Sequence, residues 1–252
     1  MLQVAFCEAP ADFSITSDLV DRVLGAHGPS WVADNIEDAP ESVRTWHPDR
    51  DGRAFFDVHR VDRYARDLSV KVPHGRFNGR RAAGDLMALT VFTIVRRLIK
   101  TGTTIDAVVL VWDMDDQPDD RRRALEQARA EAATWASFEI VLGRPNAKRE
   151  AWVLAGFDPI DDDEAVRLLA ARQELGFAPH QHSARLDATD DLAKRSAKRI
   201  HGVLLGDDWD RQRRCWTMTP LETLELRGEG NGLRAFLAEV KARLVPIIPH
   251  RS

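Results

Sequence analysis

The sequence predicts an α/β fold built on a mostly parallel β-sheet. Short apolar runs at 2–7, 106–112 and 137–143 indicate buried strands. Segments with apolar residues at helical spacing separate and follow these runs. Strands that alternate with helices favour a parallel sheet over an antiparallel one. The expected architecture is therefore a sheet flanked by helices.

Each element of the N-terminal third has a local reason. The run 2–7 reads as a buried strand that ends at Glu8, and 17–28 as a helix that begins with Ser or Asp and stops at Gly. Residues 29–53 are rich in Pro, Trp and charge and are expected to be irregular. A strand is predicted at 53–61 and a long loop at 62–82, where Pro and Gly recur.

The rest of the chain is more regular. A strong helix is predicted over 82–100, with basic residues in its last turn that suit the helix dipole. The run 106–112 is rich in β-branched valine, which favours a strand. An Ala-rich helix follows at 121–134, and a strand at 137–143. Further helices are predicted at 146–157, 161–176, 189–205 and 232–245.

Length and composition limit the classes of protein. The 252 residues are enough for one large domain or two small ones. We expect a catalytic domain at 1–160, with 29–82 as an insertion, and a helical extension packed on it at 161–252. The net charge of −4 argues against non-specific coating of nucleic acid. Without a membrane span, a secretory signal or a cysteine framework, we expect a cytoplasmic protein.

Acidic side chains follow two of the predicted strands. Glu8 ends the first, with Asp12 four residues later, and Asp113 and Asp115 follow the run 106–112. In an open parallel sheet, functional groups gather at the carboxyl ends of the strands. Several carboxylates in one place repel unless a cation is present, and oxygen ligands suit Mg²⁺ or Mn²⁺ better than zinc. We therefore expect Glu8, Asp12, Asp113 and Asp115 to bind a divalent metal.

These motifs resemble those of the Toprim domain. "CEAPAD" is similar to the strand that ends in Glu and is followed by Asp, and "VWDMDD" to the later strand that ends in D-x-D. Ala9 stands where the family has glycine after the Glu. "RPNAKREAWVLAGF", with Pro145, Glu150 and Trp152, resembles a segment of small stand-alone bacterial Toprim proteins of phage-defence loci.

The resemblance implies a metal-dependent nuclease, as in the OLD-type nucleases, and a role in anti-phage defence. Two ions would clamp the scissile phosphate. Glu150 would be an extra ligand or general base, and Arg144, Lys194 or Lys198 would neutralise the developing charge. The chain has no phosphate-binding Walker loop, so the expected partners are nucleic acid and a separate ATPase subunit; a homo-oligomer is also possible.

Two other functions stay open for the same residues. A catalytically silent Toprim-like module would serve in complex assembly with the ATPase. A haloacid-dehalogenase phosphatase also places D-x-D after a strand, but Gln117 stands where that family has Thr or Val, and Glu8 is left unexplained. His180 and His182 form an H-x-H pair without a third ligand, which favours a simple loop over a zinc site.

Overall fold

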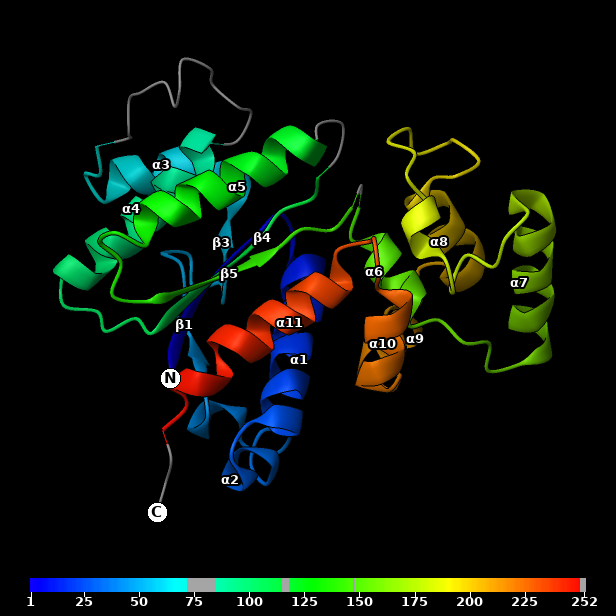
Figure 1. Cartoon of the computed structure of the whole chain (residues 1–252), viewed down its shortest axis with the longest axis horizontal. Helices are drawn as coiled ribbons and strands as arrows, with labels where there is room; N and C mark the ends of the chain where they lie inside the picture. The colour runs from blue at the N-terminus through cyan, green and yellow to red at the C-terminus, as the bar shows by residue number, and fades with distance from the viewer. Residues whose placement is uncertain (72–84, 115–117, 147, 250–252) are drawn as a thin grey trace. The chain divides into compact units, whose positions relative to one another are not determined.

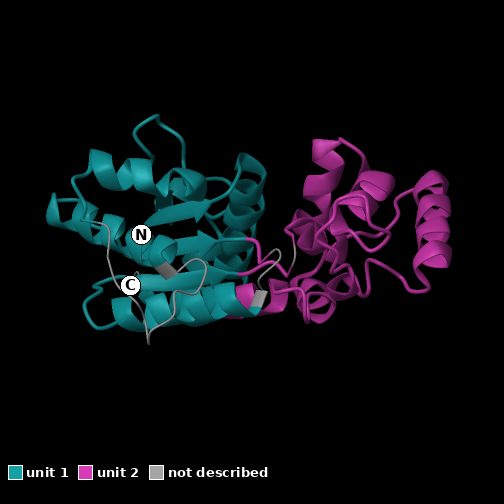
Figure 2. Cartoon of the chain, turned by 90° about the horizontal axis from the view of Figure 1, so that it is seen from above, with its two compact units in different colours: residues 1–112, 117–143, 239–252 teal, residues 113–116, 144–238 magenta. Residues whose placement is uncertain are grey.

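The chain forms two compact units. The computed structural model describes residues 1–71, 85–114, 118–146 and 148–249. Unit 1 comprises 1–112, 117–143 and 239–252, and unit 2 comprises 113–116 and 144–238, shown in teal and magenta in Figure 2. These units are grouped differently from the ranges 1–160 and 161–252 expected from the sequence. The chain leaves unit 1 at the end of a strand, near residue 143, and its last residues return to unit 1.

Unit 1 is built on a parallel sheet, which confirms the predicted fold class. β1 pairs with β2, β3 and β4, β4 pairs with β5, and every pairing among the described residues is parallel. Phe6 lies opposite Leu110 on one side and Phe56 on the other. The strands are β1 (Leu2–Cys7), β2 (Thr45–Trp46), β3 (Phe56–Asp57), β4 (Ala107–Val111) and β5 (Glu139–Gly143).

Helices cover both faces of this sheet. α3, α4 and α5 lie on one side, and α1 lies on the other against β1 (Figure 1). All five residues of β4 are buried, as expected for a strand covered on both faces. The helices of unit 1 before the last strand are α1 (Pro10–His27), α2 (Ser30–Ala33), α3 (Val61–Asp67), α4 (Asp85–Lys100) and α5 (Pro118–Ala132).

Several boundaries differ from those predicted. α1 begins at Pro10 instead of Ser17, because proline is well suited to the first turn of a helix. The strand predicted at 53–61 is reduced to the two residues of β3. Helix α3 occupies the start of the loop predicted at 62–82, and the rest of that loop from residue 72 lies outside the described residues. The region predicted to be irregular contributes α2 and β2.

The C-terminal segment completes unit 1. Arg129 on α5 donates two hydrogen bonds to Glu239, at 2.7 and 2.8 Å. Arg243 binds the same carboxylate at 2.7 Å and lies 3.2 Å from Glu139, the first residue of β5. Leu244 and Ile248 are buried. Residues near the end of the chain are therefore held by charges from α5 and β5.

The regular secondary structure in the described part of unit 2 consists of helices. Its core contains the fully buried Trp152, whose ring stacks on Phe236 with centroids 5.1 Å apart. The indole Nε1 donates to the carbonyl of Asn231 at 2.9 Å. Trp152, which carried part of the family resemblance, is thus a core residue. The helices are α6 (Glu150–Ala155), α7 (Asp162–Leu175), α8 (Ala197–Leu205), α9 (Trp209–Thr217), α10 (Leu221–Arg227) and α11 (Leu233–Arg243), the last of which continues into unit 1.

Short 3₁₀ helices complete the described secondary structure, at Pro40–Ser42, Val58–Arg60, Ser183–Arg185 and Val245–Ile247. No helix in the described ranges is both long enough and apolar enough to cross a membrane.

A buried ion pair joins α7 to α9. Arg211 donates from Nε and Nη2 to the two carboxylate oxygens of Glu164, at 2.7 and 2.8 Å, and both side chains are buried. Arg211 also donates to the carbonyl of Asp158 at 2.7 Å and lies over the Phe157 ring. The backbone N–H of Ile160 donates to Glu164 at 3.0 Å. Because the charges are matched and hydrogen-bonded, their burial is tolerated.

Replacing Glu164 by Gln should lower the free energy of unfolding by about 3 kcal/mol, because the buried Arg211 loses its anionic partner. Chemical denaturation at neutral pH measures this change. Asp163→Asn removes an exposed carboxylate from the same helix and is the matched control, with an expected change below about 1 kcal/mol.

The same pair predicts the direction of acid sensitivity. Hydrogen bonds from Arg211 outweigh burial and hold the pKa of Glu164 below its usual 4.5. A carboxyl group with a lowered folded-state pKa stabilises the fold at neutral pH, and this contribution is lost as the pH falls below about 4.5. The stability of the wild type should therefore fall more steeply in acid than that of Glu164→Gln. Parallel acid titrations of the two proteins would contradict the assignment.

Candidate functional site

The carboxyl ends of the strands of unit 1 gather acidic side chains at one edge of the sheet. Glu8 follows β1 directly, and Asp57, the last residue of β3, lies opposite Cys7 in the register. Because the strands are parallel, their carboxyl ends lie at the same edge, where functional sites of such sheets form.

Glu8 and Asp12 belong to the same strand end. α1 begins two residues after Glu8, which places Asp12 in its first turn. Burial raises the pKa of the Cys7 thiol well above its usual value, and the negative charges of Asp12 and Glu8 raise it further. Both carboxylates therefore lie close enough to Cys7 to act on the same thiol.

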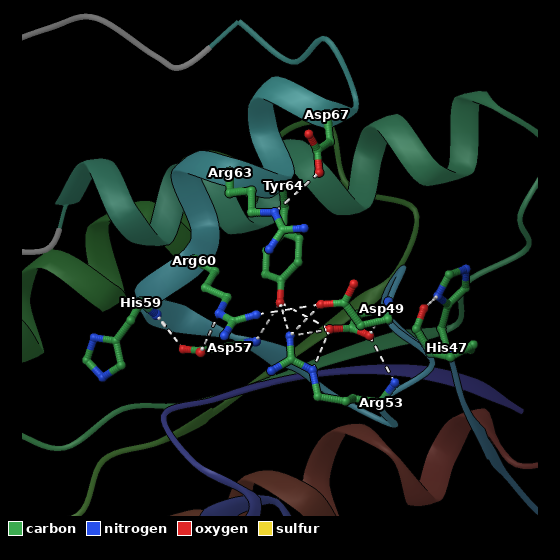
Figure 3. Close-up of polar contacts among 11 residues, drawn as sticks. His47, Asp49, Arg53, Asp57, His59, Arg60, Arg63, Tyr64 and Asp67 are labelled. Carbon is green, nitrogen blue, oxygen red and sulfur yellow. Dashed lines mark hydrogen bonds and ion pairs between the residues drawn. The ribbon is translucent and has the colours of Figure 1, made fainter.

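A histidine also lies beside Glu8. Nε2 of His59 is 3.6 Å from Oε2 of Glu8, and the histidine side chain is 66% exposed. The backbone N–H of His59 donates to the Asp57 carboxylate at 2.8 Å, which begins the short 3₁₀ helix (Figure 3). Nε of Arg60 lies 3.3 Å from the same carboxylate. The edge thus carries acids, an imidazole and a guanidinium.

Sequence reasoning missed Asp57, His59 and Arg60. A strand was predicted across all of them, whereas the chain turns after Asp57. A signal was present, because Asp often accepts a hydrogen bond from the backbone two residues later and so starts a turn.

A buried carboxylate orders the segment that delivers these residues. The Asp49 side chain is fully buried and accepts hydrogen bonds from Nε and Nη2 of Arg53, at 2.8 and 2.5 Å. It also accepts the backbone N–H groups of Asp51 and Arg53, both at 2.9 Å, and the Tyr64 hydroxyl at 3.2 Å. The Tyr64 oxygen accepts the backbone N–H of Asp57 at 3.3 Å (Figure 3). The network therefore reaches the end of β3.

Asp49 is ionised within this network. Burial alone would raise its pKa, but the backbone and side-chain hydrogen bonds from Arg53 and the guanidinium charge outweigh it, so the pKa lies below its usual value. Burial raises the pKa of Tyr64, whose hydroxyl stays protonated and can donate to Asp49. The carboxylate of Asp49, the guanidinium of Arg53 and the hydroxyl of Tyr64 are thus partners of one another.

The acidic and basic residues predicted for catalysis do not all lie in unit 1. Asp113 follows β4 by two residues and Arg144 follows β5 directly, and both are grouped with unit 2, as are Glu150, Lys194 and Lys198. Asp115 lies outside the described residues. The structure therefore brings Glu8 and Asp12 to one strand end, and Asp113 and Arg144 remain candidates by their positions after the neighbouring strands.

Glu150 is held within unit 2. Its Oε1 lies 3.3 Å from Nη2 of Arg149, and both side chains are largely buried. His201 on α8 is close enough for the charge of Glu150 to act on it, but burial dominates and lowers the pKa of His201. Glu150 thus lies in a small charged cluster between α6 and α8.

The two predicted lysines lie in the same part of unit 2. Nζ of Lys198 donates to Asp191 at 2.7 Å, and Lys148 binds the other oxygen of that carboxylate. These hydrogen bonds, that of Lys148 foremost, lower the pKa of Asp191 to about 2. The charge of Lys198 is therefore matched locally by Asp191, whereas Lys194 is exposed.

The donors of the sheet edge suit a hard cation. Within the described ranges there is no group of three or more His, Cys, Asp or Glu side chains placed to hold a metal. Mg²⁺ does not require one, since it commonly keeps several waters and binds through one or two carboxylates and a substrate phosphate. Glu8 and Asp12 meet that requirement by chemistry and by position.

Comparison with known proteins adds no family. No protein-family model matches the chain, and no curated protein or solved structure is significantly similar to it.

Both thiols should be unreactive in the folded protein. Burial and the charges of Asp12 and Glu8 raise the pKa of Cys7, and burial above all raises that of Cys215 to about 11. Because the thiolate is the reactive form, a thiol reagent at neutral pH should label the folded chain slowly and both cysteines rapidly after denaturation. Rapid labelling of Cys7 without denaturation would contradict its placement behind the acidic edge.

The Asp49 network should be essential for the stability of unit 1. Asp49→Asn removes the charge that binds Arg53 and disturbs a fully buried site, so the free energy of unfolding should fall by about 3 kcal/mol. Urea denaturation measures the change. Asp51→Asn, in the same turn but half-exposed, is the control and should change stability by less than about 1 kcal/mol.

Proposed function

We propose that this chain is a divalent-metal-dependent nuclease of the Toprim type. The observation that carries the proposal is the position of Glu8 and Asp12 at the carboxyl end of the central parallel strand, with His59 beside Glu8. Active sites of open parallel sheets form at this edge. The resemblance of the E-x-x-x-D and D-x-D motifs to those of Toprim domains supports the same assignment.

Glu8 and Asp12 would hold Mg²⁺ or Mn²⁺ in this function. A bound divalent ion activates water and stabilises the leaving oxygen in phosphodiester hydrolysis. The second motif, Asp113 with Asp115, is proposed to supply the further carboxylates. Oxygen donors of this kind favour Mg²⁺ or Mn²⁺ over zinc.

Other residues of the edge have roles that follow from their chemistry. His59 is exposed and adjacent to Glu8, so it can carry a proton to or from a substrate that reaches the edge. Arg60 is partly exposed beside Asp57 and can bind a phosphate oxygen of the nucleic-acid backbone. The Asp49 network holds both residues in place, because Tyr64 links Asp49 to the backbone of Asp57.

The resemblance to Toprim proteins also suggests a biological role. The small stand-alone bacterial Toprim proteins that the chain resembles belong to phage-defence loci, and OLD-type nucleases work with an ATPase. We therefore propose a cytoplasmic defence nuclease with a separate ATPase subunit as partner.

A second function is a catalytically silent assembly module. The absence of a group of three metal-ligating side chains in the described part of the chain favours this alternative, as does Ala9 in place of the family glycine. The two functions differ in one property that can be measured directly, the binding of a divalent ion at Glu8 and Asp12.

The purified chain should cleave plasmid DNA, linear DNA or total RNA in Mg²⁺ or Mn²⁺, and EDTA should abolish cleavage. Glu8→Gln and Asp12→Asn should each reduce the rate roughly 100-fold or more, the effect typical of losing one electrostatic group of a catalytic site. Calorimetric titration of Mn²⁺ should show binding to the wild type and weaker binding to both variants.

Asp62→Asn is the matched control, because it removes an exposed carboxylate from α3 of the same unit and should leave both cleavage and Mn²⁺ binding unchanged. Asp113→Asn tests the second motif separately. Mn²⁺ binding without cleavage would point to the missing ATPase partner. If the wild type neither binds Mn²⁺ nor cleaves any of the substrates, the nuclease proposal is rejected and the assembly module remains.

A further inference from the structure

Unit 2 contains an open cavity that the proposed nuclease does not use. It measures about 460 Å³ and lies between α7 and the segment 176–185 that follows it. Leu168, Leu169 and Arg172 of α7 line it at helical spacing, opposite Phe177, His180 and Arg185. Its volume is within the range of small-molecule sites, roughly 300–1,000 Å³.

The charged part of the cavity is cationic. Arg172 and Arg185 line it beside the polar His180, Gln181 and His182, and no described lining residue is acidic. Within the described residues, no carboxylate forms an ion pair with Arg172 or Arg185. The Arg185 guanidinium lies over the Phe177 ring, 4.0 Å from its centroid, and is thereby held at the cavity. Two guanidinium groups are thus available to an anion from solvent.

His180 lies within this positive field. It is 8% exposed, and its Nδ1 has no hydrogen-bond partner among the described residues. Burial lowers its pKa most, and the charges of Arg227, His182 and Arg172 lower it further, while Asp158 opposes them. A buried polar atom without a partner is unfavourable. A bound anion would offset the positive charges around His180 and could also form a hydrogen bond with its imidazole.

The remaining lining defines the other part of the occupant. Pro159, Ala165, Leu168, Leu169 and Phe177 give the cavity a mainly apolar wall. A ligand of this site therefore combines an apolar body with an anionic group. A phosphomonoester carries a charge of about −1.5 to −2 at neutral pH, which matches two guanidinium groups better than a single carboxylate does.

The neighbouring hollow is a poorer anion site. It measures about 690 Å³ and shares Gln181, His182 and Arg185 with the first. Its lining includes the acidic Glu229, and its Arg227 is already paired with Asp158 at 3.0 Å. The unpaired charge therefore favours the cavity beside α7.

We propose that the cavity between α7 and residues 176–185 binds a phosphomonoester that carries an aromatic ring, of the size of a nucleoside monophosphate, with its phosphoryl group on Arg172 and Arg185. The H-x-H pair, which has no third metal ligand among the described residues, then belongs to an anion site. This site is separate from Glu8 and Asp12 and does not depend on the nuclease proposal.

Calorimetric titration of the full chain with AMP, adenosine and inorganic phosphate tests the site, in EDTA so that no metal contributes. AMP should bind at least tenfold more tightly than either adenosine or phosphate, because only AMP offers both the charge and an aromatic ring that can pack on the apolar wall. Arg172→Ala and Arg185→Ala should each weaken AMP binding tenfold or more. Arg214→Ala, an exposed arginine of α9 outside the cavity, is the control and should leave binding unchanged.

A measurement on the wild type guards against misfolded variants. The imidazole resonances of His180 should move when AMP is added, while those of the exposed His27 in unit 1 should not. Failure of AMP to bind at millimolar concentration would overturn the proposal. Equal binding of AMP and adenosine, unchanged binding after both arginine substitutions, or an unmoved His180 signal would overturn it as well.

Discussion

Strand β1 pairs in parallel with β2 and β3 along one edge and with β4 along the other, and the chemistry of unit 1 depends on this constraint. Parallel pairing turns every strand in the same direction, so residues that are distant in sequence finish at one edge. Glu8 and Asp57 meet there for that reason. β2 and β3 are only two residues long, and the Asp49 network provides the order that such short strands cannot provide by themselves.

The central part of the fold was predictable because its signals are long and local. β1, β4 and β5 are apolar runs, and α4 and α5 have clear periodicity, so their types and approximate limits follow from the sequence. β2 left no pattern, since two residues cannot show a period, and the pattern at 53–61 predicted a strand longer than β3. α9 was missed because its hydrophobicity is low and its buried face includes Arg211, which only its tertiary partner Glu164 makes compatible with burial.

The candidate site shows the same division. Glu8 and Asp12 were found because each stands next to an element with a strong signal. The positions of His59 and Asp57 depend on a turn that Tyr64 and Asp49 hold in place. The contact of His59 with Glu8 joins two distant segments, and no local sequence pattern predicts it. Lys198 shows the opposite kind of error, in which a residue predicted for catalysis has a local partner instead. Position along the chain cannot reveal that Asp191 already accepts hydrogen bonds from Lys198 and Lys148.

Arg129 pairs with Glu239 and Arg243 pairs with Glu139, and these contacts have a consequence for folding during translation. Unit 1 is discontinuous, and its third piece, residues 239–252, follows unit 2 in the sequence. All of unit 2 is synthesised before that piece appears. During translation, α5 and β5 therefore remain incompletely covered until residues 239–252 are synthesised. Unit 2 is nearly continuous in sequence and can fold before then.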